Sequence, residues 1–387
     1  MGATRGMIDV VQRSAASDCV VVGAGLTGLS TALHLGWRGM TVHVLDRGRI
    51  GDGTSSKASG WISAQLRTPN PLLELVLASL AYYPAFLEAL GDDCGFERSG
   101  SLVVFDSDSQ LEQRRMLDAT QRQVAAFKGA RFVDAREVHD LEPALAPEIV
   151  GGALFEDDAQ VEPLRLLEAM VRAAPGANVV VHQGAEVTAV ARDGSGWRVE
   201  TTIGTFVAPR VALAAGAWTT GIAELVGAEV PVVPVAGQLL VTRPRTGALR
   251  HCVVHQPDPR FATKLACGVR PAVDGRLWIG TTYRAGTFDA SITADDTASI
   301  LGAFEKVFPA IADTPVEQAW AGVRPVPADL VPIYGAVPAA EGAFAAVPVA
   351  GLAEAAIAGR LVADLICGST PTVTAAPFDP ARFAAAD

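Results

Sequence analysis

Residues 18–46 read DCVVVGAGLTGLSTALHLGWRGMTVHVLD. The apolar, β-branched runs at 18–22 and 41–45 predict two buried strands, and the spacing of leucine and alanine over 29–36 predicts a helix between them. The turn from the first strand into the helix is GAGLTG, residues 23–28. The order of strand, glycine turn, helix, strand and terminal acid is typical of a βαβ unit that binds a dinucleotide.

Each glycine of this turn has a physical role in such a unit. Gly23 allows a tight turn, Gly25 lets the backbone approach a pyrophosphate, and Gly28 lets the helix pack close to the strand. The helix N-terminus offers unpaired N–H groups and a partial positive charge to phosphates, and Leu26 and Thr27 in the turn before the predicted helix are expected cofactor contacts. The competing interpretation is a glycine turn without a ligand.

An acid and a stretch of small residues follow the second strand. Asp46 ends that strand and is expected to accept hydrogen bonds from the adenosine ribose. Residues 47–60, RGRIGDGTSSKASG, are small and rich in hydroxyls, which suits packing against a pyrophosphate and an isoalloxazine ring. The βαβ unit alone does not separate FAD from NAD, but this downstream stretch favours FAD. No second GxGxxG follows a strand later in the chain, so no site for NAD(P)H as an internal reductant is visible. The cofactor contacts expected in this stretch are Arg47, Thr54, Ser55, Ala58, Ser59 and Gly60.

Several ordered motifs then resemble one family over residues 18–370. They are GAGLTG with Asp46, TSSKASG at 54–60, AAGAW at 214–218, PVAGQ at 234–238, GRLWIGTT at 275–282 and WAGVRP at 320–325. The chain resembles the FAD-dependent D-amino-acid oxidase superfamily, in its glycine oxidase and sarcosine oxidase branch. The resemblance implies further cofactor contacts at Val187, Ala215, Gly216, Trp218, Gly322, Arg324, Gly351 and Leu352.

The same resemblance implies an α/β fold, in which a Rossmann-like βαβ FAD-binding domain is interleaved with a substrate domain built on an antiparallel β-sheet. The FAD-binding domain is expected at 18–85, 160–222 and 318–376, the substrate domain at 86–159 and 223–317, and tails at 1–17 and 377–387. Some sarcosine oxidases attach flavin through a Cys near the late motif. Here no Cys lies between Cys267 and Cys367, so FAD is expected to bind non-covalently.

The family's chemistry moves hydride from the carbon beside an amine to flavin N5, giving an imine that hydrolyses. The cofactor carries this reaction, so no metal site or catalytic triad is expected. In amino-acid-specific members an Arg binds the substrate carboxylate. Arg324 corresponds to that Arg in the late motif. The alternative is an Arg tied to a structural carboxylate such as Asp329. The closing helix should direct its start, near Gly351, at the flavin. We expect Glu354 to cap this helix; the alternative is that it binds a substrate cation.

The sequence also departs from these relatives at the substrate site. Residues 346–351, AVPVAG, lack the His and Arg that glycine oxidases carry there, and residues 261–270 lack their Tyr. Trp278 stands where sarcosine oxidases have an oxygen-activating Lys. Lys264 and Trp61 are the candidate replacements, against the alternatives of a solvated strand-edge Lys and a core Trp. These losses imply a substrate that is larger or less anionic than glycine.

The composition of the chain limits the kinds of partner that we expect it to bind. The 31 basic and 42 acidic residues give a net charge of −11, which disfavours nucleic acid and anionic membrane surfaces. No run of about 18 apolar residues is free of helix breakers, so no membrane span is expected, and the cysteines show no metal-type spacing. We expect a cytoplasmic enzyme, able to form homo-oligomers, that binds a small amine or amino acid and reduces oxygen, a quinone or a carrier protein.

Two other functions stay open on the sequence. One keeps FAD but oxidises a C–OH carbon, as in relatives that act on 2-hydroxyacids or glycerol phosphate. The other is a non-catalytic FAD-binding subunit of a complex, which the losses at Ala266, Val347 and Val349 would allow. Turnover of amines but not of hydroxy acids would separate the first alternative from the main hypothesis.

Overall fold

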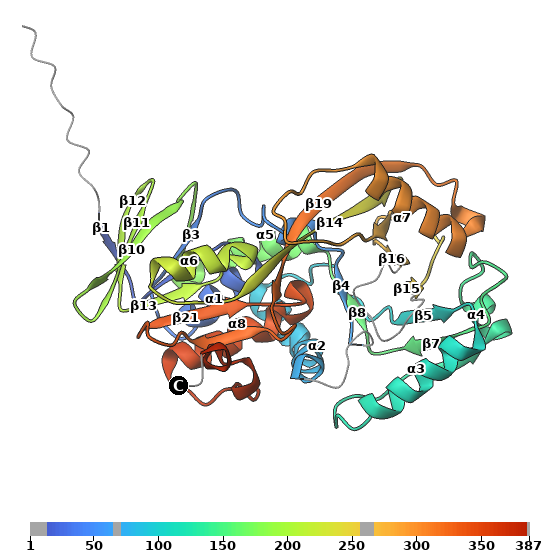
Figure 1. Ribbon diagram of the computed structural model, residues 1–387, viewed down its shortest axis with the longest axis horizontal. Helices are drawn as coiled ribbons and strands as arrows, with labels where there is room; N and C mark the ends of the chain where they lie inside the picture. Colours follow the sequence, from blue (N-terminus) through green and yellow to red (C-terminus); the bar gives the residue numbers. More distant parts are fainter. Residues whose placement is uncertain (1–13, 65–70, 256–266, 385–387) are drawn as a thin grey trace, which may run out of the picture.

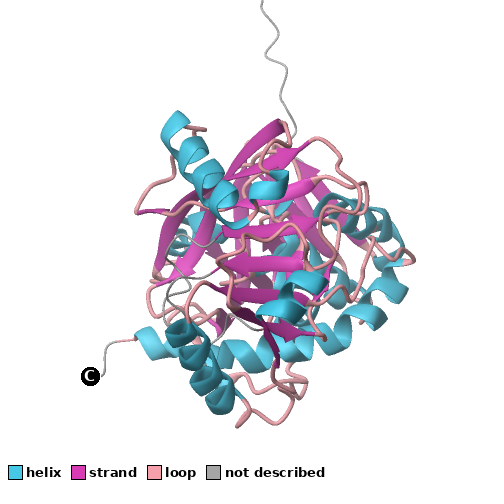
Figure 2. Ribbon diagram, turned by 90° about the vertical axis from the view of Figure 1, so that its right-hand side faces the viewer, coloured by secondary structure: helices cyan, strands magenta, loops and turns pink. Residues whose placement is uncertain are grey.

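The structure is a computed structural model, and it describes residues 14–64, 71–255 and 267–384 of the 387-residue chain. Its elements form two adjoining parts, one around β2 and α1 and the other around β14, β19 and β5 (Figure 1). In the view of Figure 2, strands occupy the interior and most helices lie around them. The α/β class expected from the sequence is confirmed.

The first part is a six-stranded sheet that contains the βαβ unit. Its order is β20 (Ile333–Ala336), β21 (Ala343–Val347), β13 (Arg210–Leu213), β2 (Cys19–Val22), β3 (Val42–Asp46) and β9 (Val179–Gln183). All neighbours are parallel except β20 and β21. Central parallel strands are covered on both faces, and all of β2 is buried. The strand, helix and strand predicted over 18–46 are therefore present.

Helices pack against this sheet and against one another. They are α1 (Leu26–Gly36), α2 (Pro71–Leu90), α5 (Pro163–Ala173) and α8 (Gly351–Cys367). Every residue of α1 is buried, because the helix contacts both the sheet and α8. The two helices approach closely at Gly359, where a Cβ would lie 2.1 Å from Ser30 Oγ.

A smaller four-stranded sheet adjoins the first. Its order is β1 (Ser14–Ala16), β12 (Gly204–Ala208), β11 (Gly196–Thr201) and β10 (Val187–Asp193), with α6 (Thr219–Leu225) nearby. Strand β1 corrects the expectation of a flexible tail over 1–17, since residues 14–16 pair in parallel with Thr205–Val207. The edge of β12 offers backbone hydrogen bonds to these residues, and local composition does not reveal such a distant partner. Residues 1–13 lie outside the described residues.

The second part is a nine-stranded, largely antiparallel sheet. Its strands are β5 (Ser101–Phe105), β6 (Arg131–Asp134), β7 (Gly151–Phe155), β14 (Val232–Thr242), β15 (Cys252–His255), β16 (Cys267–Pro271), β17 (Leu277–Gly280), β18 (Arg284–Ala285) and β19 (Val316–Pro327). Helices α3 (Asp108–Gln121), α4 (Ala135–Leu141) and α7 (Ala294–Val307) contact it. This is the antiparallel sheet expected for a substrate domain, although β5 and β15 pair in parallel.

Strand β19 connects the two parts and is not predicted by its sequence. Gly322, Pro325 and Pro327 are residues that strands disfavour. The strand nevertheless pairs antiparallel with β14 over the full length of both. The domain boundary expected at residue 318 therefore falls inside a strand of the second sheet.

Helix α2 bears on the expectation that the chain has no membrane span. It is 20 residues long with a hydropathy of 1.4, so by length and composition it could cross a membrane. Half of its most apolar window is buried within the fold, and the helix packs against α8. A core helix has these same properties, so the composition of α2 is weak evidence for a span.

The contact between α1 and α8 predicts the effect of a single methyl group. Gly359→Ala should lower the free energy of unfolding by about 2 kcal/mol, because overpacking outweighs the better helix propensity of alanine. The measurement is urea unfolding followed by circular dichroism. Gly302→Ala in α7 is the matched control, since a Cβ there meets nothing within 4 Å, and it should be neutral or slightly stabilising. Equal effects of the two substitutions would contradict this account.

Candidate functional site

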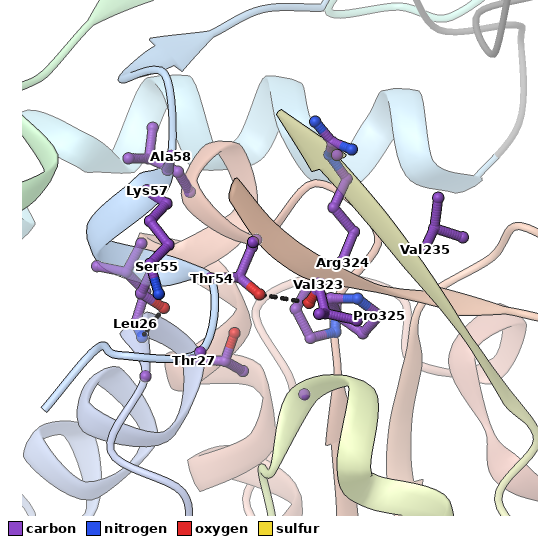
Figure 3. A pocket seen from close by; sticks show the side chains of 18 of the residues that line it. Leu26, Thr27, Thr54, Ser55, Lys57, Ala58, Val235, Val323, Arg324 and Pro325 are labelled. Carbon is purple, nitrogen blue, oxygen red and sulfur yellow. Dashed lines mark hydrogen bonds between the residues drawn. The ribbon is translucent and has the colours of Figure 1, made fainter. Parts of the chain in front are cut away.

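A cavity of about 1290 Å³ lies between the glycine turn of the first sheet and the face of the second. Its walls come from segments far apart in the sequence: the turn after β2, residues 45–63, the turn after β13, β14, β19 and the start of α8. Figure 3 shows this arrangement, with Leu26 and Thr27 on one side and Arg324 on the other. The cavity is large enough for a dinucleotide and a small substrate together.

The glycine turn leaves no room for side chains. A Cβ on Gly23 would lie 2.3 Å from the carbonyl oxygen of Ala214, and one on Gly28 would lie 2.0 Å from that of Gly23. Gly23 also has a φ of +112°, which favours glycine. Gly28 is thus needed for packing behind the turn and does not line the cavity, whereas Gly25 does.

The start of α1 is held by a hydroxyl. Ser55 Oγ accepts a hydrogen bond from the Leu26 N–H at 3.0 Å (Figure 3). The neighbouring Thr54 hydroxyl donates to the Val323 carbonyl of β19. The loop expected beside the flavin therefore ties the helix N-terminus to the second sheet. Gly60, whose φ is +86°, does not line the cavity; its carbonyl accepts the Val161 N–H at 2.8 Å.

Asp46 makes local hydrogen bonds that the sequence does not predict, and its contact with the ribose stays a prediction. Its carboxylate accepts the Ala24 N–H at 2.8 Å and the Gly48 N–H at 2.9 Å, so it fixes the glycine turn while still lining the cavity. Next to it, the Arg47 guanidinium lies 4.3 Å from the Trp218 ring. Trp218 in turn stacks on Phe288 at 5.5 Å. Sequence reasoning missed Phe288, which no local motif marks.

Arg324 presents a positive charge in the opposite wall. On β19 it faces Val235 of β14, and its Nη2 donates to Thr281 Oγ1 at 2.8 Å. The guanidinium lies 4.8 Å from the Tyr283 ring. It occupies space that Gly237 leaves open, since a Cβ on Gly237 would lie 2.2 Å from Nη1. Burial lowers the pKa of Arg324.

Asp329 does not neutralise this charge. It pairs instead with Arg382 at 2.7 Å, so the alternative partner for Arg324 suggested by the sequence is wrong. Within residues 14–64, 71–255 and 267–384, no carboxylate lies within ion-pair distance of Arg324. An unpaired guanidinium in a cavity wall is suited to bind an anionic ligand.

Trp61 and Gly268 face each other at the substrate side. Trp61 belongs to β4 (Trp61–Ile62), which pairs with β8 (Ala159–Gln160), and its indole N–H donates to Ser101 Oγ at 2.6 Å. A Cβ on Gly268 would lie 3.8 Å from the Trp61 ring. The indole is therefore anchored by its polar end while its ring faces the cavity.

A second arginine also reaches the cavity but is already paired. Arg270 is 1% exposed, and its Nη1 donates to Glu162 Oε1 at 2.8 Å and to Gln160 Oε1 at 3.3 Å. It also lies 4.9 Å from the Trp278 ring. The partner of Arg270 cannot be found from local sequence, since Glu162 lies more than 100 residues away along the chain. Lys264, the other candidate on this segment, lies outside the described residues.

The remaining sequence-predicted contacts lie around one cavity. The predicted contacts that line it are Gly23, Gly25, Leu26, Thr27, Asp46, Arg47, Thr54, Ser55, Ala58, Ser59, Trp61, Val187, Ala215, Gly216, Trp218, Gly322, Arg324, Gly351 and Leu352. The glycine turn with the N-terminus of α1 at one end and the start of α8 further along form a continuous lining. These features fit FAD, whose phosphates need free N–H groups and a close backbone.

Comparison with known proteins identifies the family. A family model described as FAD dependent oxidoreductase matches residues 18–365. The chain belongs to this family. It is also 31% identical to the glycine oxidase of Geobacillus kaustophilus, over 94% of this chain and 97% of that protein. The hydrogen cyanide synthase subunit HcnC of Pseudomonas aeruginosa is 29% identical, over 95% and 96% of the two chains.

Solved structures agree with this assignment. The crystal structure of the Geobacillus kaustophilus glycine oxidase has a TM-score of 0.88 at 28% identity and covers 96% of this chain and 100% of that one. An iminodiacetate oxidase from Chelativorans shares the fold, with a TM-score of 0.82 at 24% identity over 94% and 98% of the chains. The predictions of an FAD cofactor and of an FAD-dependent oxidoreductase are confirmed, and these relatives support oxidation of an amine or amino acid.

The phosphate end of the cavity gives a test of cofactor binding. Gly25 has extended backbone angles that valine also adopts, but a Cβ there would lie 3.0 Å from Ser55 Oγ, so circular dichroism must first show that Gly25→Val folds. Its side chain would occupy the approach to the pyrophosphate. We expect FAD affinity to fall at least about tenfold, measured by titrating apoprotein with FAD and following flavin fluorescence. Gly221→Val is the control, because a Cβ there meets nothing within 4 Å. Unchanged affinity in Gly25→Val would contradict the assignment of this turn.

Proposed function

We propose that this FAD-dependent oxidoreductase oxidises the C–N bond of an amino acid whose carboxylate binds Arg324 and whose side chain or N-substituent is apolar and larger than that of glycine. The observation that carries the proposal is the unpaired Arg324 guanidinium in a largely apolar wall. The glycine oxidases among the relatives support an amino-acid substrate.

Arg324 suits a carboxylate better than an uncharged group. Its Nη2 already donates to Thr281 Oγ1 and its Nη1 lies 3.4 Å from the Thr282 carbonyl, so the guanidinium is held in one orientation. A guanidinium has five N–H donors, which leaves donors for a ligand. An anion that binds there would also compensate a partly buried charge, and such charge-assisted hydrogen bonds are strong.

The space beside Gly268 supports a bulky substituent. Gly268 has no side chain, and the cavity around it is lined by Leu239, Val254, Ile279 and the ring of Trp61. Arg270 is the nearby cation, but its ion pair with Glu162 leaves that pair neutral overall. A substituent in this region therefore meets apolar surface, which favours alkyl or aromatic groups over a second charge.

Each part of the chain then has a defined role in the reaction. When bound, FAD supplies the acceptor for the hydride at its N5. Arg324 binds and orients the substrate carboxylate, which fixes the position of the adjacent carbon. The ring of Trp61 and the apolar wall beside Gly268 exclude water from that carbon, and the residues from Thr54 to Ser59 and from Val349 to Leu352 would hold the cofactor.

We also place the enzyme in the cytoplasm. All five cysteines are free, and Cys19, Cys94, Cys252 and Cys267 are buried. Free thiols of this kind are typical of a reducing compartment. Burial raises the pKa of Cys19, Cys252 and Cys267 to about 12 in each case, so these thiols stay protonated and unreactive.

Removing the guanidinium tests the carboxylate site. Arg324→Met should lower kcat/KM for an accepted amino acid by about 10²- to 10³-fold, because a charge-assisted contact is lost. The corresponding amine without a carboxylate should be a poor substrate for both the unmodified enzyme and Arg324→Met. Its kcat/KM should differ little between the two. Initial rates of flavin bleaching under anaerobic conditions give both numbers. Arg136→Met, at an exposed surface ion pair, is the control, and equal losses for acid and amine would contradict the proposal.

Substrate size gives a second test. Across glycine, alanine, leucine, phenylalanine and their N-methyl derivatives, kcat/KM should rise with apolar size, by about tenfold or more for each well-placed group. Gly268→Leu should fill the space beside Trp61 and reverse this preference, lowering kcat/KM for phenylalanine much more than for alanine. A profile with glycine as the best substrate, unchanged by Gly268→Leu, would show that the apolar region is not part of the substrate site.

A further inference from the structure

Helix α8 begins at the cavity and has a buried acid in its first turn. Val349, Ala350, Gly351, Leu352 and Ala353 all line the cavity. Glu354 follows them and is 0% exposed. An acid is a common helix cap at the protein surface, where water screens its charge. Here the charge is placed inside the protein, one residue behind the cavity wall.

The Glu354 carboxylate accepts hydrogen bonds at both oxygens. Oε1 accepts the N–H groups of Ala350 and, at 3.1 Å, of Val349. Oε2 accepts the Tyr334 hydroxyl at 2.6 Å. The cap expected from the sequence is therefore confirmed, and it takes the N–H groups just before the first turn. Those of Gly351, Leu352 and Ala353 belong to the first turn, where N–H groups have no partner within a helix.

These contacts favour the ionised acid. At least three donors point at its two oxygens, and a carboxylate that accepts several hydrogen bonds at a helix N-terminus is stabilised in its charged form. Burial, and secondarily the charge of Glu354, raise the pKa of Tyr334 well above its usual range. The Tyr334 hydroxyl therefore keeps its proton and acts as a donor to Glu354.

A helix N-terminus aimed at a flavin stabilises the negative charge that the flavin gains on reduction. A carboxylate at the same helix end has the opposite effect. The two contributions act from the same place, since Glu354 lies in the first turn whose N–H groups face the cavity. The pocket thus holds the positive end of α8 and a negative charge that offsets it.

We propose that Glu354 is a positioning residue that lowers the reduction potential of the bound FAD, by offsetting the positive N-terminal end of α8 while its hydrogen bonds hold that end in place. The proposal concerns the cofactor side of the cavity and does not depend on the identity of the substrate. A lower potential makes the reduced cofactor a better electron donor and the oxidised cofactor a weaker acceptor.

The test is the reduction potential of FAD in the holoenzyme, measured by equilibration with a redox dye and without substrate. Glu354→Gln keeps an acceptor for the N–H groups of Val349 and Ala350 but removes the charge. It should shift the reduction equilibrium about tenfold toward reduced FAD, which is about 30 mV for a two-electron couple. An unchanged or lower potential in Glu354→Gln would overturn the proposal.

Tyr334→Phe is the matched variant, because it removes a hydrogen bond to Glu354 and keeps the charge. It should shift the equilibrium by less than about threefold. If Tyr334→Phe reproduces the shift of Glu354→Gln, the effect comes from disturbed packing and the proposal fails. If Glu354→Gln loses FAD while Tyr334→Phe retains it, Glu354 acts in cofactor retention, and the proposal also fails. Because the measurement needs no substrate, an error in the proposed substrate class would leave its result unaffected.

Discussion

The close packing of α1 is the constraint on which the rest of the site depends. Its first turn lies against the end of β2, where Gly28 and the Gly23 carbonyl leave no space for a Cβ. Its middle lies against α8, where Gly359 leaves none beside Ser30. Because the helix is buried on every side, its N-terminus has a fixed position. Free N–H groups in a fixed position are what a pyrophosphate needs.

Helix α8 is positioned by this same packing, and its own N-terminus consequently faces the cavity. The cofactor region is thus bordered by two helix starts, one at Leu26 and one at Gly351. The two helix starts differ in the group that caps them. At the start of α1 the neutral hydroxyl of Ser55 accepts a hydrogen bond from a backbone N–H. At the start of α8 the carboxylate of Glu354 accepts such hydrogen bonds. A neutral cap leaves the partial positive charge at the start of α1 available to phosphates. A charged cap offsets part of the positive charge at the start of α8.

The substrate side is built on a different principle. Strand β19 pairs with β14 throughout, and this sheet presents Arg324 to the cavity as a cation with its orientation fixed by Thr281. The other arginine of the region, Arg270, is neutralised by Glu162. The wall therefore combines one available positive charge at Arg324 with apolar surface around Gly268, a combination suited to a carboxylate that carries an apolar group.

Sequence reasoning predicted much of the cofactor side and less of the substrate side. The turn at 23–28 could be predicted because its glycines are required by the backbone conformation of a few consecutive residues. The start of α8 at Gly351 and the Glu354 cap are equally local. The alternative that Arg324 pairs with Asp329 is wrong, since Asp329 is close in sequence but pairs with Arg382. Strand β19 was not predicted, because its prolines and glycine are disfavoured in strands and only the pairing with the distant β14 makes it one.

The sequence by itself determined the βαβ unit, the family and the cofactor, because these depend on short motifs whose backbone requirements are local. Only the tertiary structure decided which polar groups in the cavity wall, and just behind it, have a partner. Arg270 finds Glu162, Tyr334 finds Glu354, and Arg324 finds no carboxylate among the described residues. The physical reason is that ion pairs and buried hydrogen bonds join segments distant in sequence, and their partners are set by how the sheets and helices pack.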